Sequence, residues 1–189
     1  KHAKMEVESC FSPDMPYVYA GRYENYWYKF LFVDNQWPTC QNEHMRSDLL
    51  KEHTYLRWTD QNSIYGVTRY SFMLLTSSTV PGYLLKYFET MYARMVELVL
   101  MQKATVLQFS SRVADISRTN MLTDSAAYIN EVSSLYQDYI VFINRFYFKE
   151  VTAQDQGIEL YDMLQKNLRL ESMVRDLDGD IQELHQYVS

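Results

Sequence analysis

Evenly spaced apolar positions run through the C-terminal part of the chain. Between Thr79 and Ile116 they recur at alternating steps of three and four, the period of one face of an α-helix. Pro81 stands where the pattern begins, and proline is tolerated in the first turn of a helix. The pattern predicts a first helix of about 38 residues, roughly 57 Å long at 1.5 Å per residue. The residues of this face are Leu84, Phe88, Met91, Met95, Leu98, Gln102, Thr105, Phe109, Val113 and Ile116.

Two further helices follow. The segment "SRTNMLTDS" interrupts the first stripe, and a second stripe then carries Ile129, Val132, Tyr136, Tyr139, Ile143 and Phe146. The third begins at "TAQD", where Thr152 and Asp155 have the spacing of a capping box. Asn167 is its one polar member, a residue that can fix register in coiled coils. This third face consists of Leu160, Met163, Asn167, Leu170, Val174, Leu177, Ile181, Leu184 and Val188.

No helix stop signal follows the third stripe. Helices commonly end with Gly or Asn just past the last apolar position, or with Pro beyond it, and the stripe runs to the final residues without one. The pattern therefore predicts one uninterrupted stalk helix over residues 152–189 that continues beyond Ser189. Two arrangements fit the three stripes: a three-helix bundle within one chain, or several subunits assembled around the third helix.

The N-terminal part has the shorter period of β-strands. Aromatic residues occupy every second position at Tyr17 and Tyr19, and again from Tyr26 to Phe32, with Glu24-Asn25 as the expected turn. A strand over 54–58, a polar turn at 60–62 and a long β-branched and aromatic run follow, in which Gly66 is expected to mark a bulge. A short helix is expected within 41–53. These tyrosines suit a sheet core, or alternatively an aromatic binding surface.

The predicted fold class is therefore α+β: a Tyr-rich antiparallel β-sheet followed by a long three-helix bundle or stalk. Residues 1–78 form a β-rich subdomain in this prediction, truncated at its N-terminus, and 79–189 form a helical one with the stalk helix at 152–189. A compact domain does not need helices near 55 Å long. We therefore expect the long helices to extend beyond the sheet.

Composition supports a folded chain of short loops. The 189 residues are 47% hydrophobic and include only 5 Gly and 4 Pro. Cys10 and Cys40 match neither a disulfide framework nor a metal-ligand spacing, which favours a reducing compartment and inert thiols. The chain begins with Lys1 and shows no signal peptide, so we expect an excised fragment. No apolar run approaches the ~20 residues of a membrane-spanning helix.

The negative charge is concentrated in the last segment. The net charge is −6, and residues 150–189 alone carry nine acidic and three basic residues, so this segment accounts for all of it. An acidic chain is a poor partner for nucleic acid, whose binding depends on cationic side chains. Enzymatic chemistry is not indicated either, because the sequence has neither a phosphate-binding glycine loop nor a G-x-S-x-G motif. The four histidines, His2, His44, His53 and His185, share no ligand spacing with one another or with a cysteine.

Several acidic residues share one flank of the third predicted helix. They are separated by multiples of seven, with Arg169 at the same phase: Asp155, Asp162, Asp176 and Glu183. Glu159 lies one turn from Asp162. Such a row is either a solvated face or a column that concentrates cations.

Two segments resemble a known family. "GIELYDMLQ" supplies Glu159, Tyr161 and Asp162, with Met163 in place of His, in the manner of an Asp-x-Tyr-Asp-His pattern at the start of a stalk helix. "SIYGVTRYSFMLL" (63–75) precedes the helices. Over residues 54–189 the chain resembles the cytosolic portion of CorA-type magnesium and divalent-cation channels or transporters.

The resemblance implies a funnel-shaped homopentamer whose stalk helix continues into the first pore-lining transmembrane helix, with a Gly-Met-Asn motif beyond Ser189. The fragment itself would be soluble, monomeric or dimeric, and would lie on the cytoplasmic side of the inner or plasma membrane. It would sense Mg²⁺ or another divalent cation between subunits and gate through the stalk. The alternative is a soluble helical scaffold or protein-interaction domain with no transport role.

Glu159 and Asp162 are the first candidate ligands. Residues three apart lie on one face of a helix, and hydrated Mg²⁺ typically takes only one or two protein carboxylates. Alternatively, both acids merely favour the N-terminal part of a helix, which is worth about 0.3–1 kcal/mol. A second candidate set comprises Asp176, Asp178, Asp180 and Glu183.

Overall fold

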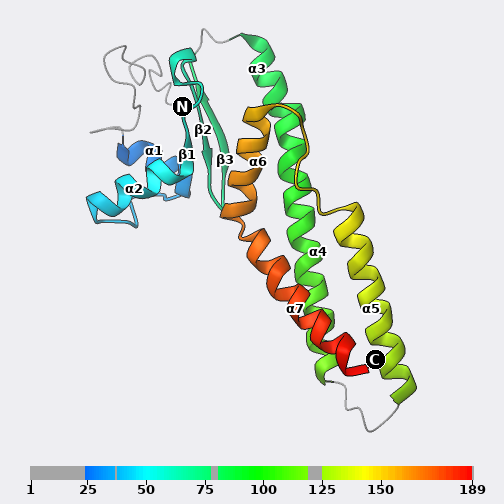
Figure 1. Ribbon diagram of the computed structural model, residues 1–189. Coiled ribbons are helices and arrows are strands. Elements are labelled where there is room, and N and C mark those ends of the chain that lie inside the picture. The colour runs from blue at the N-terminus through cyan, green and yellow to red at the C-terminus, as the bar shows by residue number, and fades with distance from the viewer. Residues whose placement is uncertain (1–23, 37, 78–80, 119–124, 189) are drawn as a thin grey trace.

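The fold combines a small antiparallel sheet with long helices. The computed structural model describes residues 24–36, 38–77, 81–118 and 125–188, and all structural statements below concern these ranges. The sheet lies between one pair of short helices and a group of longer helices that extend away from it (Figure 1). The prediction of a mixed fold, with an antiparallel sheet followed by a helical part that extends beyond it, is confirmed. Tyr17 and Tyr19 lie outside the described residues.

The sheet has three strands. β1 (Thr54–Tyr55), β2 (Ser63–Val67) and β3 (Phe72–Thr76) lie in the order β1-β2-β3, and both pairs are antiparallel. The polar turn expected at 60–62 is a short 3-10 turn, Thr59–Gln61, followed by Asn62 with a φ of 53°. The long run expected after it is divided into two strands by a turn at 68–71, which the Thr68 backbone N–H closes onto the Ser71 carbonyl at 2.9 Å.

Gly66 does not mark a bulge, contrary to the sequence prediction. The ladder continues through it, with Gly66 opposite Thr54 on one side and Met73 on the other. A Cβ placed there would lie 2.4 Å from Leu31 Cδ1 and 2.9 Å from Trp27 Cζ2. The glycine is therefore required by the close approach of a helix to the sheet.

That helix corrects a second prediction. Tyr26, Tyr28, Phe30 and Phe32 were expected in a strand after a turn at Glu24-Asn25, whereas α1 (Glu24–Phe32) is helical from that point. The buried residues are Trp27, Tyr28 and Leu31, while Tyr26 and Phe30 are each 53% exposed. Buried positions at i, i+1 and i+4 form a helical stripe. Because six of the seven residues from Tyr26 to Phe32 are large and apolar, an alternating pattern arises by coincidence.

The short helix expected within 41–53 is confirmed as α2 (Glu43–His53), which the Asn42 side chain caps by accepting from the Met45 N–H at 2.9 Å. With α1 it covers one side of the sheet (Figure 1). A small core lies between them, in which the Trp27 indole N–H donates to Thr54 Oγ1 at 2.9 Å. Its buried members are Trp27, Tyr28, Leu31, Leu50 and Ile64.

The first long helix is confirmed. It consists of α3 (Gly82–Tyr87), a π-helical segment (Phe88–Tyr92) and α4 (Ala93–Arg118) without interruption. Phe88 and Tyr92 pack this segment against the face of the sheet that is opposite α1 and α2. There the Phe72 and Phe88 rings stack with centroids 5.6 Å apart. Tyr65, fully buried, packs among these rings, so at this position the sheet tyrosine belongs to the core.

The second helix is α5 (Ser125–Arg145), and its buried face is displaced from the predicted one. Val132 and Tyr139 are buried as expected, but Ile129 is 40% and Phe146 is 46% exposed. The face turns instead toward Tyr128, Leu135 and Phe142, because α5 packs against both α4 and α7.

The predicted stalk helix over 152–189 is two helices, α6 (Asp155–Asn167) and α7 (Leu170–Val188). They meet at Leu168 and at Arg169, whose φ is 56°. Leu168 and Leu170 are both buried. On one continuous helix, side chains two residues apart would point to nearly opposite sides. The break lets both side chains reach the core, so the uninterrupted helix predicted from the sequence is wrong.

The start of the third helix and its polar face member also differ from the prediction. Gln154 occupies the N-cap position, and Thr152 Oγ1 accepts from the Gln154 N–H at 3.2 Å, so there is no capping box at Thr152. Asn167 donates from Nδ2 to the Met163 carbonyl oxygen at 2.8 Å, within its own helix. Asn167 is the last residue of α6, and this hydrogen bond stays within one helix.

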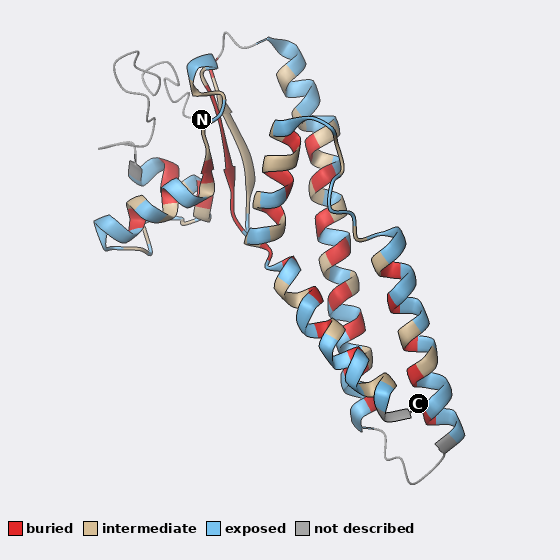
Figure 2. Cartoon of the chain, viewed as in Figure 1, coloured by how far each residue is buried: buried red, intermediate tan, exposed pale blue. Residues whose placement is uncertain are grey.

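A larger core lies between the long helices and the face of the sheet that is opposite α1 and α2. Buried residues line the facing sides of α4, α5 and α7 along most of their length (Figure 2). Val174, Leu177 and Ile181 of α7 are buried within the single chain, where α7 packs against α4 and α5. Gln102 is fully buried in this core, where its Nε2 donates to the Phe146 carbonyl oxygen at 2.8 Å. Tyr161 Oη, beside it, donates to the Phe148 carbonyl oxygen at 2.7 Å.

Candidate functional site

Glu159 joins α6 to the sheet. The Tyr55 hydroxyl and the Arg57 guanidinium both donate to its carboxylate, and Arg57 also lies 3.4 Å from Asp155 Oδ2. The hydrogen bond from Tyr55, followed by that from Arg57, lowers the pKa of Glu159 below its ordinary value. Burial, with the nearby Glu159 carboxylate, raises the pKa of the Tyr55 hydroxyl. Glu159 is therefore held in its charged form by partners from the sheet side of the molecule.

A second ion pair links α6 to the same side. Lys166 Nζ, in the last turn of α6, lies 2.9 Å from Glu52 Oε1 at the end of α2. Lys166 lowers the pKa of Glu52 by this hydrogen bond and by its charge. Both side chains are more than half exposed, so the pair contributes little to stability by itself. Together with the contacts of Arg57 to Asp155 and Glu159, it links both ends of α6 to the side of the sheet and α2.

Asp162 has different neighbours. It lines an open cavity of about 900 Å³ between α5, α6 and α7, together with Tyr147, Lys149 and Glu171. Although Asp162 remains largely exposed, partial burial of its carboxyl group and the nearby charge of Glu150 raise its pKa. A raised carboxyl pKa means that negative charge is disfavoured there. A bound cation would offset that cost.

The second candidate set lies on α7. Asp176, Asp180 and Glu183 are exposed and Asp178 is half-buried, with Asp178 Oδ2 accepting from Gln182 Nε2 at 2.8 Å. Because the helix is broken at Leu168 and Arg169, Asp155 and Asp162 belong to α6 whereas Asp176 and Glu183 belong to α7. The single acidic flank predicted over both segments is therefore divided between two helices.

The histidines and cysteines do not form a metal site in the part of the chain that the structure describes. Within it, no group of three or more His, Cys, Asp or Glu side chains could hold a metal ion. His53 Nδ1 lies 2.9 Å from the Val67 carbonyl oxygen, and the His185 ring lies 4.2 Å from that of Tyr136 between centroids. Cys40 is a half-buried free thiol. His2 and Cys10 lie outside the described residues.

Sequence reasoning missed the partners of Glu159. Tyr55 and Arg57 precede it by about a hundred residues, and no local pattern joins the two segments. One signal was available: Tyr55 and Arg57 are only two residues apart in the sequence, so a single distant carboxylate can accept from both. Their partner could come only from the packing of α6 on the sheet.

No family model matches the chain, and neither a characterised protein nor a solved structure matches it significantly. In the described ranges, no helix is both long enough and apolar enough to span a membrane. The function must therefore be argued from the fold, the carboxylates and the sequence motifs.

Proposed function

We propose that the chain is the cytosolic regulatory domain of a CorA-like Mg²⁺ or divalent-cation channel or transporter. The observation that supports the proposal best is the course of the chain after the sheet. α4 leads away from the sheet, α5 leads back, and α6 and α7 run outward again from the sheet to the far end of the helices (Figure 1). Together, α6 and α7 thus connect the surface that carries Glu159 and Asp162 with the end of the molecule farthest from the sheet.

The proposed coupling uses the two carboxylates differently. Glu159 anchors α6 to the sheet through Tyr55 and Arg57. Asp162, one turn later and close to Glu150, offers the charge that a hydrated divalent cation would neutralise. In the homopentamer that the family resemblance implies, cations between neighbouring subunits hold the stalks closed. Their loss leaves carboxylates repelling one another, with ~10 Å screening at 0.1 M salt.

A protease-protection assay on the full-length protein tests this role. We expect millimolar Mg²⁺ to slow cleavage of the wild-type assembly, and replacement of both residues, Glu159→Gln with Asp162→Asn, to abolish that effect. Asp162→Asn alone should remove most of it, because Glu159 is already neutralised by Arg57. An exposed acidic residue elsewhere on the helices, changed in Glu131→Gln, serves as the control and should leave protection intact.

Unchanged protection in the double variant would exclude these residues as the sensor. The set Asp176, Asp178, Asp180 and Glu183 would then be tested in the same way. The proposal also requires two apolar segments of about 20 residues, with a Gly-Met-Asn motif between them, after Ser189 in the full gene product. A polar domain in that place would rule out the channel.

A soluble scaffold that presents its helices to another protein is the second candidate. It is supported by exposed apolar side chains on α3, where Tyr83 is 58% and Leu85 is 57% exposed. The two proposals differ in the same assay. A scaffold shows no protection by Mg²⁺ in either the wild type or the variants.

A further inference from the structure

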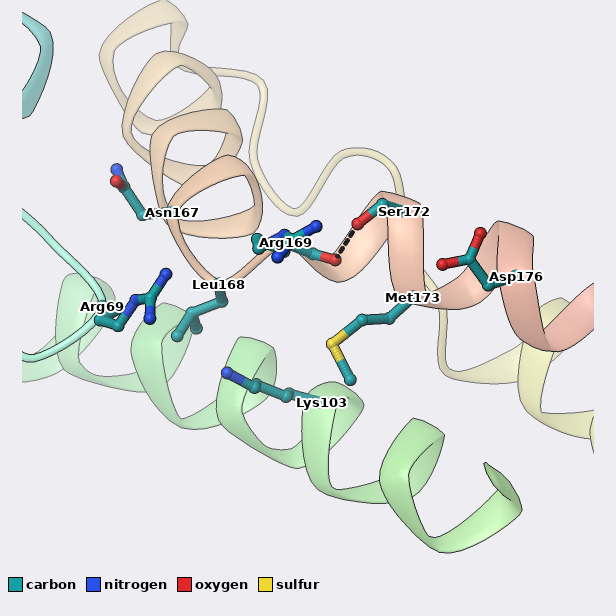
Figure 3. A pocket seen from close by; sticks show the side chains of 8 residues that line it. All are labelled: Arg69, Lys103, Asn167, Leu168, Arg169, Ser172, Met173 and Asp176. Carbon is teal, nitrogen blue, oxygen red and sulfur yellow. Dashed lines mark hydrogen bonds between the residues drawn. The ribbon is translucent and has the colours of Figure 1, made fainter. Parts of the chain in front are cut away.

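We infer that a cavity at the break between α6 and α7 is a binding site for a small phosphate-bearing molecule. The cavity has a volume of about 370 Å³, within the range of small-ligand pockets. Three basic side chains line it, each from a different part of the chain: Arg69 from the β2–β3 turn, Lys103 from α4 and Arg169 from the break. Figure 3 shows Arg169 above Lys103, with Arg69 to one side.

The charge at this place is opposite to that of the chain. The net charge of the protein is −6, yet the cavity has three cationic side chains against one carboxylate, Asp176. Within the described ranges no salt bridge is recorded for Arg69, Lys103 or Arg169. Three like charges that line one cavity with a single carboxylate repel one another, and a bound anion reduces that repulsion.

The positions that carry these charges are held in place before any ligand binds. Thr68 Oγ1 accepts from the backbone N–H groups of Tyr70 and Ser71 at 3.1 and 3.0 Å, which fixes the turn around Arg69. Ser172 Oγ donates to the Arg169 carbonyl oxygen at 2.9 Å and braces the break. Lys103 lies on the middle of α4. A backbone that is already fixed at these positions reduces the entropy lost when a ligand binds.

The lining indicates which anion fits. Guanidinium groups match phosphate oxygens with paired N–H donors, and the lysine adds a compact positive charge. Asp176 and Met173 lie at the other end of the cavity from Arg69 (Figure 3). A carboxylate accepts hydrogen bonds from hydroxyl groups, and a thioether suits an apolar surface. The ligand class is therefore an organic phosphate whose body carries hydroxyl groups, such as a nucleoside monophosphate.

The attraction comes from the side chains and not from a helix end. The C-terminus of α6 and the N-terminus of α7 meet at Arg169, and their partial charges are of opposite sign and offset each other. The proposal depends neither on the ion-sensing role of Glu159 and Asp162 nor on a membrane. Its failure would leave that role untouched, because none of the three basic residues takes part in it.

Calorimetric titration of the chain, without divalent cations, tests the proposal with inorganic pyrophosphate and adenosine monophosphate. We expect both to bind, and Arg69→Gln, Lys103→Gln and Arg169→Gly each to weaken binding at least about tenfold, equivalent to 1.4 kcal/mol. The φ of 56° at Arg169 suits glycine, so that variant should fold. Asp176→Asn should strengthen binding of pyrophosphate, since it removes the one negative charge of the cavity.

Matched controls remove a positive charge elsewhere. Lys86→Gln on α3 and Arg118→Gln at the end of α4 are exposed and do not line the cavity. They should leave affinity unchanged, which separates a site from general attraction to a basic surface. Phosphatidylcholine vesicles with and without phosphatidylinositol 4-phosphate form a second arm. Binding only to the phosphoinositide vesicles, with the same three variants defective, would identify a lipid headgroup as the source of the phosphate.

Two results would overturn the inference. One is the absence of binding by pyrophosphate, adenosine monophosphate and phosphoinositide vesicles alike. The other is equal loss of affinity in the cavity variants and in the Lys86→Gln and Arg118→Gln controls.

Discussion

Gly66 lies where α1 approaches the sheet so closely that a Cβ would overlap its side chains. Trp27, which a Cβ at Gly66 would meet, is itself held by its hydrogen bond to Thr54, and Leu31 is fully buried. Neither side chain can move without disturbing the small core. Because glycine lacks a Cβ atom, α1 can pack closely against the sheet at this position.

Gly66→Ala should therefore destabilise the protein. Overpacking of a filled core typically costs about 1–3 kcal/mol, and we expect a loss of that size in the free energy of unfolding measured with urea. Gly179→Ala in α7 is the matched control, because apart from the neighbouring backbone of its own helix no atom lies within 4 Å of the added carbon. A glycine inside a helix costs up to about 1 kcal/mol relative to alanine, so the control should be stabilised. Equal midpoints for Gly66→Ala and wild type would contradict the close contact.

Glu159 should make stability depend on pH in the acidic range. Its folded-state pKa is lowered by Tyr55 and Arg57, so the unfolded chain takes up the proton more readily and protonation favours unfolding. The stabilisation is complete above the ordinary glutamate pKa of about 4.3 and is lost as the pH falls through the lowered value. In Glu159→Gln the decline of unfolding free energy with acidification should be shallower than in wild type. Glu183→Gln, an exposed carboxylate on α7, should retain the wild-type slope.

A helix or strand could be predicted where its apolar residues follow a single period, and could not where they fit two. The long first helix packs through one face, so its apolar residues repeat with a helical period. That period predicted the helix directly from residues 79–116. α1 could not be recognised, because a segment composed almost wholly of large apolar residues fits both periods. The break at Leu168 and Arg169 was hidden for a related reason, since steps of three and four continue across it. The phase change is seen in the structure, where Leu168 and Leu170 are both buried and Arg169 has a φ of 56°.

The candidate site was predictable to a similar degree. The acidity of the third helix and the proximity of Glu159 to Asp162 follow from local spacing. The different environments of the two residues do not, because they depend on which distant segments pack against each side of α6. Arg57 lowers the pKa of Glu159 and Glu150 raises that of Asp162, and these two charged residues come from separate parts of the chain.

The packing of α7 can be tested at one buried position. Leu177 is 1% exposed within the single chain, where α7 contacts α4 and α5. Leu177→Ala should cost roughly 2–5 kcal/mol, the usual range for truncating a buried leucine. Leu107→Ala on α4, where the side chain is 51% exposed, is the control and should change stability by no more than about 0.5 kcal/mol. If Leu177→Ala does not change the thermal unfolding temperature, the apolar face of α7 does not stabilise the single chain and would be buried only against another subunit.

At the scale of the whole molecule, one strand serves two cores. Ile64 of β2 belongs to the small core under α1 and α2, whereas its neighbours Tyr65 and Val67 belong to the large core shared with the long helices. Successive residues of a strand point to opposite faces, so loss of either core exposes one face of β2. The two cores therefore support each other through the strand that separates them.

This arrangement predicts a single cooperative unfolding transition. Trp27 lies in the small core and Trp58 packs against the large one, so fluorescence reports on both sides of the sheet, while far-ultraviolet circular dichroism reports mainly on the long helices. We expect coincident urea transitions by the two methods, the usual criterion for two-state behaviour. Leu50→Ala in the small core and Leu135→Ala in the large core should each shift both curves together, with a loss of roughly 2–5 kcal/mol apiece. If Leu50→Ala shifts the fluorescence curve and leaves the dichroism curve in place, the α1–α2 side unfolds independently and β2 does not couple the two cores.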